Sequence, residues 1–265
     1  MNNKLSRAVY RLAMFAMVAL TISTGYCGIS DLRKKAERGD AAAQLSLAEA
    51  YAFGEGVAKN MSEAVRWYRK AAAQGVVMAQ YNLGICYEHG DGVAMNKSEA
   101  VRWFRKAAEL GHSGAQHNLG VCYANGDGVA MNKSEAVRWY CKAAEQEHAG
   151  AQFNLAVCYE NGEGIEQNKQ TAVHWYTLAA TNGNDPKAQF NLGKCYYDGD
   201  GVEMNKAEAI RLFRKSADQG CDRAIEMLKI IESSKVDANK NKFCPNCGKQ
   251  AQAGANFCGE CGKRL

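Results

Sequence analysis

The chain has 265 residues, of which 47% are apolar and only two are proline, and its net charge at neutral pH is +5. This length allows a substantial core, and the scarcity of proline allows uninterrupted helices. The excess charge lies at the two ends, because residues 1–30 carry three bases without an acid and the stretch from Glu232 onward has a net charge of +3. The centre is close to neutral, at about −1, so nucleic acid is an unlikely partner of this part.

Residues 1–30 have the pattern of a targeting segment. Lys4, Arg7 and Arg11 precede an apolar run of eleven residues from Leu12 to Ile22. Such a run matches the core of a signal peptide and is short for a transmembrane helix. We predict that residues 1–30 are a signal peptide or membrane-targeting segment, that the protein is periplasmic, secreted or envelope-associated, and that only this segment meets a membrane. Lipidation at Cys27, retention as an amphipathic helix and a cytoplasmic location are the alternatives.

An Ala-Gln pair marks a repeat that fills the central part of the chain. The spacing between pairs is 36, 36, 36 and then 37 residues. The pairs are Ala43-Gln44, Ala79-Gln80, Ala115-Gln116, Ala151-Gln152 and Ala188-Gln189. A fixed period in this range is typical of stacked helical hairpins. It predicts an all-α fold, an α/α solenoid.

Each repeat is predicted to hold two helices, here named helix A and helix B. In helix A, Leu83 and Tyr87 share a stripe, and Gly84 allows a close approach of the neighbouring helix. Gly90 is suited to end this helix in the left-handed conformation. Helix B is expected to begin at Asn96, whose side chain caps the first turn while Glu99 reaches back to the Asn96 amide.

The buried face of helix B is predicted from apolar residues that recur at helical spacing. They are Ala100, Trp103, Phe104, Ala107 and Ala108. The pattern A-Q-x-x-L-G-x-x-Y-x-x-G-x-G-V followed by K-x-E-A-V-x-W-Y-x-K-A-A resembles the Sel-one-like repeat, a relative of the tetratricopeptide repeat. This resemblance implies a solenoid that scaffolds protein complexes, and the matching positions carry packing rather than chemistry.

The resemblance covers residues 31–231. About five full repeats are expected, at 43–78, 79–114, 115–150, 151–187 and 188–223, with a capping helix at each end because an open end would expose an apolar face. Residues 232–242 are polar and lack periodicity, so we predict a flexible linker there.

A metal-binding motif follows at residues 243–265. Cys244 and Cys247 form one C-x-x-C pair, and Cys258 and Cys261 form a second. Two such pairs provide four thiolates, the closed tetrahedral ligand set of structural zinc. The segment resembles a zinc ribbon, and we predict one Zn²⁺ with a structural role.

The partner surface is predicted on helix A, on the concave face of the solenoid. Four asparagines recur one repeat apart, each following an aromatic residue, and such side chains suit an extended peptide. They are Asn82, Asn118, Asn154 and Asn191, preceded by Tyr81, His117, Phe153 and Phe190. The alternative is that these asparagines belong to the repeat consensus and serve packing.

The main functional hypothesis is a non-enzymatic scaffold for protein–protein interaction. One alternative is a β-lactamase-like or penicillin-binding hydrolase, as described for cysteine-rich members of the repeat family. Those members pair cysteines across the turn after helix B, where this chain has Ala107 and Ala108. No histidine has a Ser or Asp partner at a recognisable spacing. The other alternative is a nucleic-acid-binding zinc-ribbon module.

Four further cysteines recur at one position of helix A. They are Cys86, Cys122, Cys158 and Cys195. Neighbouring helices lie about 8 to 10 Å apart, whereas a disulfide needs Cα atoms within about 7 Å. We predict that these four are reduced packing residues.

Overall fold

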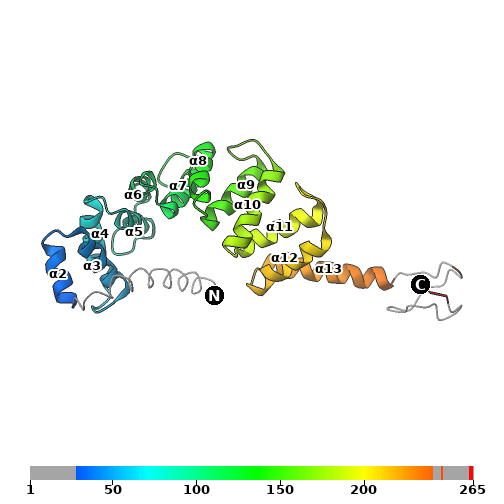
Figure 1. Cartoon of the computed structure of the whole chain (residues 1–265), viewed down its shortest axis with the longest axis horizontal. Helices are drawn as coiled ribbons and strands as arrows, with labels where there is room; N and C mark the ends of the chain where they lie inside the picture. The colour runs from blue at the N-terminus through cyan, green and yellow to red at the C-terminus, as the bar shows by residue number, and fades with distance from the viewer. Residues whose placement is uncertain (1–27, 241–245, 247–262, 265) are drawn as a thin grey trace. The chain divides into compact units, whose positions relative to one another are not determined.

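In the computed structural model, the described residues are 28–240, 246 and 263–264, and this part of the chain is almost entirely helices and short loops (Figure 1). Twelve helices are present in it. They are α2 (Ile29–Glu37), α3 (Ala41–Phe53), α4 (Met61–Ala73), α5 (Val77–His89), α6 (Lys97–Glu109), α7 (Ser113–Asn125), α8 (Lys133–Ala144), α9 (Ala149–Asn161), α10 (Lys169–Asn182), α11 (Pro186–Asp198), α12 (Lys206–Asp218) and α13 (Asp222–Lys240). None of these helices is long and apolar enough to cross a membrane.

The helices form two compact units. Among the described residues, unit 1 holds α2 to α6 and ends at Leu110, and unit 2 begins at Gly111 and holds α7 to α13. Within each unit every helix packs against the next one in sequence. The odd-numbered helices α3 to α11 are helices A, and the even-numbered helices α4 to α12 are helices B. The predicted all-α repeat fold is confirmed, and α2 lies where the N-terminal capping helix was predicted.

Helix B is capped in the same way in all five repeats. The side-chain oxygen of an asparagine accepts a hydrogen bond from the backbone N–H three residues later, at 3.0 to 3.1 Å. The five asparagines are Asn60, Asn96, Asn132, Asn168 and Asn205. This half of the predicted capping box satisfies an amide that has no partner within the helix.

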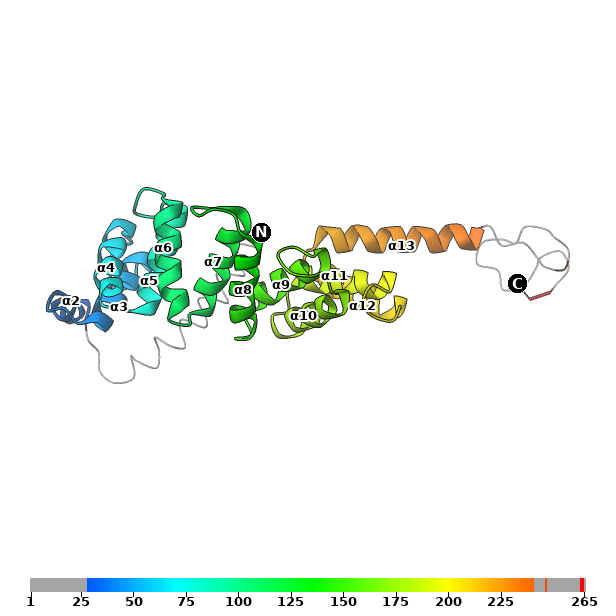
Figure 2. The same cartoon turned by 90° about the horizontal axis from the view of Figure 1, so that it is seen from above.

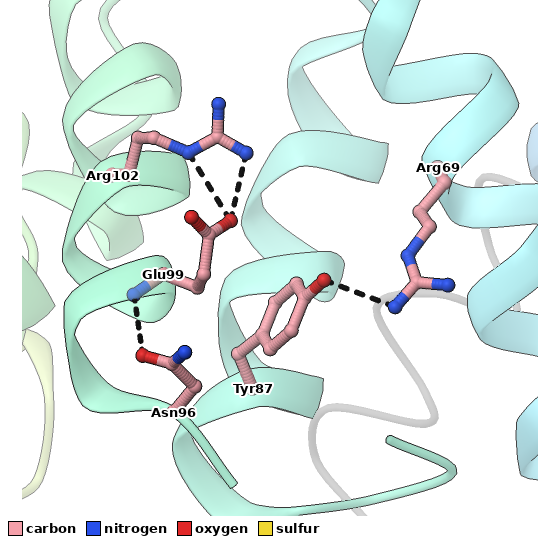
Figure 3. Close-up of polar contacts among 5 residues, drawn as sticks. All are labelled: Arg69, Tyr87, Asn96, Glu99 and Arg102. Carbon is pink, nitrogen blue, oxygen red and sulfur yellow. Dashed lines mark hydrogen bonds and ion pairs between the residues drawn. The ribbon is translucent and has the colours of Figure 1, made fainter. Parts of the chain in front are cut away.

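The other half of the predicted box is wrong in α6. The Asn96 amide donates to the Tyr87 carbonyl at 2.8 Å, so it does not need the Glu99 side chain. Glu99 instead accepts from Arg102 at 2.7 Å, as Figure 3 shows. The loop after helix A therefore closes onto its own last turn, and Glu99 forms an ion pair along the helix surface.

Close packing within three of the hairpins explains Gly84 and its equivalents. A Cβ atom placed at Gly84 would lie 2.6 Å from the ring of Phe104 on helix B. Gly120 faces Tyr140 and Gly193 faces Phe213 in the same way. The predicted close approach is confirmed, because no larger residue fits beneath these rings without a shift.

Successive repeats also contact one another through the second glycine of the G-x-G loop. Gly92 has a φ of +71°, and a Cβ atom there would lie 2.3 Å from the backbone of Met61, at the start of the preceding helix B. Gly164 and Gly201 approach the starts of α8 and α10 equally closely. Such contacts lock each loop onto the previous repeat.

Buried glutamines form a second connection between helices. Gln44 donates to the Ala36 carbonyl at 3.0 Å and accepts from Gln74 at 2.8 Å. The same side-chain pairing, 30 residues apart, joins Gln116 to Gln146 at 2.7 Å and Gln189 to Gln219 at 2.9 Å. A buried amide with both ends bonded avoids the cost of an unpaired polar group.

Two repeats lack the second glutamine. The positions 30 residues after Gln80 and Gln152 hold Leu110 and Asn182. In both cases the buried glutamine Oε1 has no hydrogen-bond partner in the described part of the chain. Leu110 is 59% exposed, so its apolar side chain adds little to the core.

The C-terminal end differs from the prediction. The helix that begins the predicted sixth repeat continues as α13 to Lys240 (Figures 1 and 2). The prediction of a flexible linker at 232–242 is therefore wrong for residues 232–240. The physical reason is that Glu, Lys, Asp and Asn remove the apolar stripe without breaking a helix, whereas Gly and Pro, which break one, are absent there.

We predict that Gly92→Ala destabilises the protein by about 2 to 4 kcal/mol, because it adds strain from a positive φ and a clash with the Met61 backbone. Gly56→Ala is the matched control, since Gly56 has the same φ of +71° and nothing within 4 Å of a Cβ atom. Urea unfolding followed by circular dichroism gives both values. Equal losses of stability in the two variants would show that the contact between the Gly92 loop and the Met61 backbone does not contribute to stability.

We also predict that Leu110→Gln stabilises the protein by about 1 kcal/mol by giving Gln80 the missing donor. Leu110 ends α6 with φ −85° and ψ 8°, and Gln74 ends α4 with φ −87° and ψ 7°, so the new side chain starts from the same backbone. Leu110→Met, which lacks the amide, serves as the control. A gain shared by both variants would contradict the hydrogen-bond explanation.

Candidate functional site

The predicted partner surface lies along helices A, and we call it the helix-A face. Its aromatic residues each pack against an aromatic ring of helix B in the same repeat, with ring centroids 5.6 to 6.1 Å apart. The pairs are Tyr81–Phe104, His117–Tyr140, Phe153–Tyr176 and Phe190–Phe213. These residues therefore have a packing role in addition to any role in binding.

One predicted face residue is buried. Phe190 is only 4% exposed, whereas Tyr81, His117 and Phe153 are partly exposed. The guanidinium of Arg223, at the start of α13, lies 4.5 Å from the centre of the Phe190 ring, and Phe190 belongs to the core cluster that includes Ala224 and Ile231. The expectation that Phe190 is displayed to a partner is wrong, because α13 covers it.

The asparagines at the two ends of the column are bonded to tyrosines of the preceding helix B. Asn82 is hydrogen-bonded to the Tyr68 hydroxyl. Asn191 Nδ2 donates to the Tyr176 hydroxyl at 3.0 Å, and Tyr176 in turn donates to Glu160 at 2.5 Å. All four asparagines are partly buried. Asn82 and Asn191 thus take part in packing between repeats.

Asn118 and Asn154 are arranged differently, around His117. The Nδ1 atom of His117 lies 3.1 Å from Asn118 Oδ1, and its Nε2 atom lies 3.1 Å from Asn154 Nδ2. A neutral ring with the proton on Nδ1 satisfies both contacts, because Nδ1 then donates and Nε2 accepts. Within the described residues this leaves the Asn118 amide nitrogen and the Asn154 carbonyl oxygen without an intramolecular hydrogen bond.

Two histidines that the sequence analysis did not place on the site lie next to it. His112 Nδ1 and His148 Nδ1 accept hydrogen bonds from the Ala115 and Ala151 amides, at 3.1 and 3.2 Å, and so cap α7 and α9. Burial and the neighbouring His117 lower the pKa of His148 to about 4. The sequence did contain a signal for this capping role. The equivalent positions in the first and fifth repeats hold Asp40 and Asp185, which cap α3 and α11.

Glu49 is a further residue that periodicity alone did not reveal. It lies on α3, partly buried, where the next three repeats have Ile85, Val121 and Val157. Burial, and then the nearby Glu55, raise the pKa of the Glu49 carboxyl to about 7. The first helix A therefore carries a carboxyl group with a raised pKa at a position that is apolar in the next three repeats and lysine, Lys194, in the fifth.

The four cysteines that recur on helix A are poor nucleophiles. Cys86, Cys122, Cys158 and Cys195 are free and buried, which confirms the prediction of unpaired packing residues. Burial raises the pKa of Cys158 and of Cys195 to about 11. These thiols stay protonated at neutral pH, whereas a nucleophilic cysteine needs the thiolate.

The predicted zinc ligands Cys244, Cys247, Cys258 and Cys261 lie outside the described residues. In the part of the chain that is described, no group of three or more His, Cys, Asp or Glu side chains is arranged to hold a metal ion. The donor set of the tail, four thiolates in two C-x-x-C pairs, is suited to zinc.

Helical hairpins with these caps, glycines and buried alanines define a tetratricopeptide-like repeat protein, a class of scaffolds suited to binding other proteins. The Sel1 repeat model matches residues 41–76, 77–112, 113–148, 149–184 and 186–221, and a zinc-ribbon domain model matches residues 243–265. The chain belongs to the Sel1 repeat family. Comparison with curated proteins gave no match.

Two solved structures support the assignment. A protective antigen of uropathogenic Escherichia coli with an SLR fold is 40% identical, with a TM-score of 0.71 over 74% of this chain. This chain spans only 42% of that antigen's length. A Sel1 repeat protein from Oxalobacter formigenes is 32% identical, with a TM-score of 0.67, over 77% of this chain and 89% of the other.

Proposed function

We propose that the protein is a non-catalytic interaction scaffold whose helix-A face holds an extended segment of a partner protein. The observation that carries the proposal is the arrangement around His117. Asn118 offers an amide donor and Asn154 offers a carbonyl acceptor, and neither group is used within the described residues. An extended peptide presents both an N–H and a C=O at each residue, so its backbone needs both kinds of partner.

The neighbouring side chains favour the same kind of ligand. His117 and Phe153 are partly exposed beside the two asparagines and provide ring surfaces on which a peptide can pack. Among the described residues, the ionisable side chain that is hydrogen-bonded to this pair is His117. Recognition here would depend on backbone hydrogen bonding and shape.

The absence of catalysis is part of the proposal. A hydrolase needs a nucleophile next to a base. His112 and His148 use Nδ1 as a helix cap, and burial raises the pKa of the helix-A thiols. These contacts favour a scaffold over the β-lactamase-like alternative, and nitrocefin turnover by the purified protein would overturn this part of the proposal.

We further propose that the tail is a zinc ribbon in which the metal has a purely structural role. Cys244, Cys247, Cys258 and Cys261 would fill all four positions of a tetrahedral site, which leaves no position for a substrate or water. The ion would stabilise a segment that is too short to form an adequate apolar core.

The partner-binding proposal predicts that Asn118→Ser together with Asn154→Ser lowers recovery of the partner roughly tenfold or more, because two hydrogen bonds are lost. Ser46 occupies the same column in the first repeat, so serine is compatible with the helix. The measurement is crosslinking and pull-down from the native organism with full-length protein.

The matched control is Asn125→Ser together with Asn161→Ser. These two exposed asparagines end α7 and α9 and lie off the Asn118 and Asn154 column, so the same chemical change there should leave recovery intact. Undiminished recovery with the Asn118 and Asn154 variant, at unchanged helicity, would refute the proposed face.

The zinc proposal predicts about one Zn²⁺ per chain and four thiols that become reactive only after chelation. Removal of the metal should unfold the tail and leave the helical circular dichroism signal unchanged, since the buried helix-A cysteines do not take part. Thiol titration with and without EDTA counts the thiols that the metal protects, and circular dichroism on the same samples follows the helices. Cys244→Ser plus Cys261→Ser serves as a metal-free control. A protein whose four tail thiols react fully before chelation would contradict the assignment.

A further inference from the structure

Two histidine rings from different repeats stack beside the helix-A face of unit 2. The centroids of His117, on α7, and His148, before α9, are 4.7 Å apart and the rings are inclined by 24°. Gly150 makes room for the stack, because a Cβ atom there would lie 3.3 Å from both rings. The stack therefore links the ring that orients Asn118 and Asn154 to the residue that caps α9.

Both rings have roles that require the neutral form. His148 accepts from the Ala151 amide through Nδ1, and His117 accepts from Asn154 through Nε2. A protonated imidazole has donors on both nitrogens and accepts nothing. Protonation of His148 would also place a positive charge at the N-terminus of α9, where the helix dipole disfavours it.

Within the described part of the chain, no acidic side chain raises the pKa of His148. The charged or titratable groups that act on His148 are His117 and His112, and both lower its pKa. From α8, His117 is faced by Tyr140, and near the end of α10 Gly183 lies against Ala149. Glu145 and Glu147 in the turn before α9 are exposed, and neither is among the groups that shift the pKa of His148.

Other repeats perform the same cap with an aspartate carboxylate. Asp40 caps α3 and Asp185 caps α11, each at 2.8 Å from the corresponding amide. A carboxylate keeps its charge down to about pH 4. Among the side chains that cap helices A, histidine thus occurs only at α7 and α9, the helices that carry Asn118 and Asn154.

We propose that the His117–His148 stack is an acid-responsive switch in the helix-A face. When the rings take up protons they repel each other, the α9 cap is lost, and the Asn154 amide must turn because it can no longer donate to His117. The two asparagines then no longer present a donor and an acceptor together. This inference rests on the proposed function for its consequence, the release of a bound segment in acid.

The direction of the effect on stability follows from linkage. Burial and the second histidine lower the pKa of His148 from 6.5 to about 4 in the folded protein, so the unfolded chain binds protons first. The contribution of His148 to stability is therefore complete well above pH 6.5 and falls as the pH drops from 6.5 toward 4. For His148 alone, the equilibrium constant for unfolding should rise roughly thirty-fold between pH 7.5 and pH 5.

The test compares wild type with His148→Asp, in which the cap is replaced by the residue that other repeats use. Urea unfolding of the full chain at pH 7.5 and pH 5.0 should show that the variant lacks the roughly thirty-fold acid-induced change that His148 contributes. His174→Asp is the control, since His174 is exposed on α10 and should leave the loss unchanged. Equal acid sensitivity of wild type and His148→Asp would overturn the switch.

A second measurement reports on the face without a partner. In nuclear magnetic resonance spectra, the side-chain amide signals of Asn118 and Asn154 should shift with the same midpoint as the His117 ring. His117→Phe, which copies Phe153 of the next repeat, should abolish the shift. Asparagine signals that ignore the histidine titration would refute the coupling.

Different experimental results would refute the proposed partner-binding face and the proposed switch. A normal switch in a protein whose partner binds independently of Asn118 and Asn154 would refute only the proposed face. A partner that depends on those asparagines, with no difference in acid response between wild type and His148→Asp, would refute only the switch.

Discussion

The fold depends on contacts too close to admit a side chain. A single hairpin cannot bury its apolar stripe alone, so each must pack against the next, and glycine allows this at two kinds of position. Gly84 lies beneath the Phe104 ring inside one hairpin, and Gly92 lies on the backbone at the start of the preceding helix B. The first contact sets the spacing within a repeat, and the second sets the spacing between repeats.

The local rules of the fold were readable from the sequence because they repeat. The Ala-Gln period, the asparagine caps of helix B and the left-handed glycines each depend on residues close together in the chain, and all were confirmed. The free, buried cysteine column was predictable for a different reason. Equivalent positions of neighbouring repeats are too far apart for a disulfide whatever the sequence between them.

Features that depend on neighbours distant in sequence were not predictable in this way. The asparagine column looked uniform, yet Asn82 and Asn191 bond tyrosines of the preceding repeat, whereas Asn118 and Asn154 bond His117. Phe190 was expected on the surface, but α13 covers it, and the length of α13 depends on residues without an apolar pattern. The candidate site thus consists of positions where one repeat differs from the others. The repeat consensus describes only what the repeats share, so it could not predict these differences.

The buried cysteines have a consequence for the conditions under which the array can exist. Cys86, Cys122, Cys158 and Cys195 are free and buried, and whole repeats separate them in the sequence. A small-molecule oxidant could reach these four thiols only after a hairpin had detached from its neighbours. These four positions therefore add no cross-link to the array, and their burial and spacing keep them from pairing with one another in reducing and in oxidising surroundings.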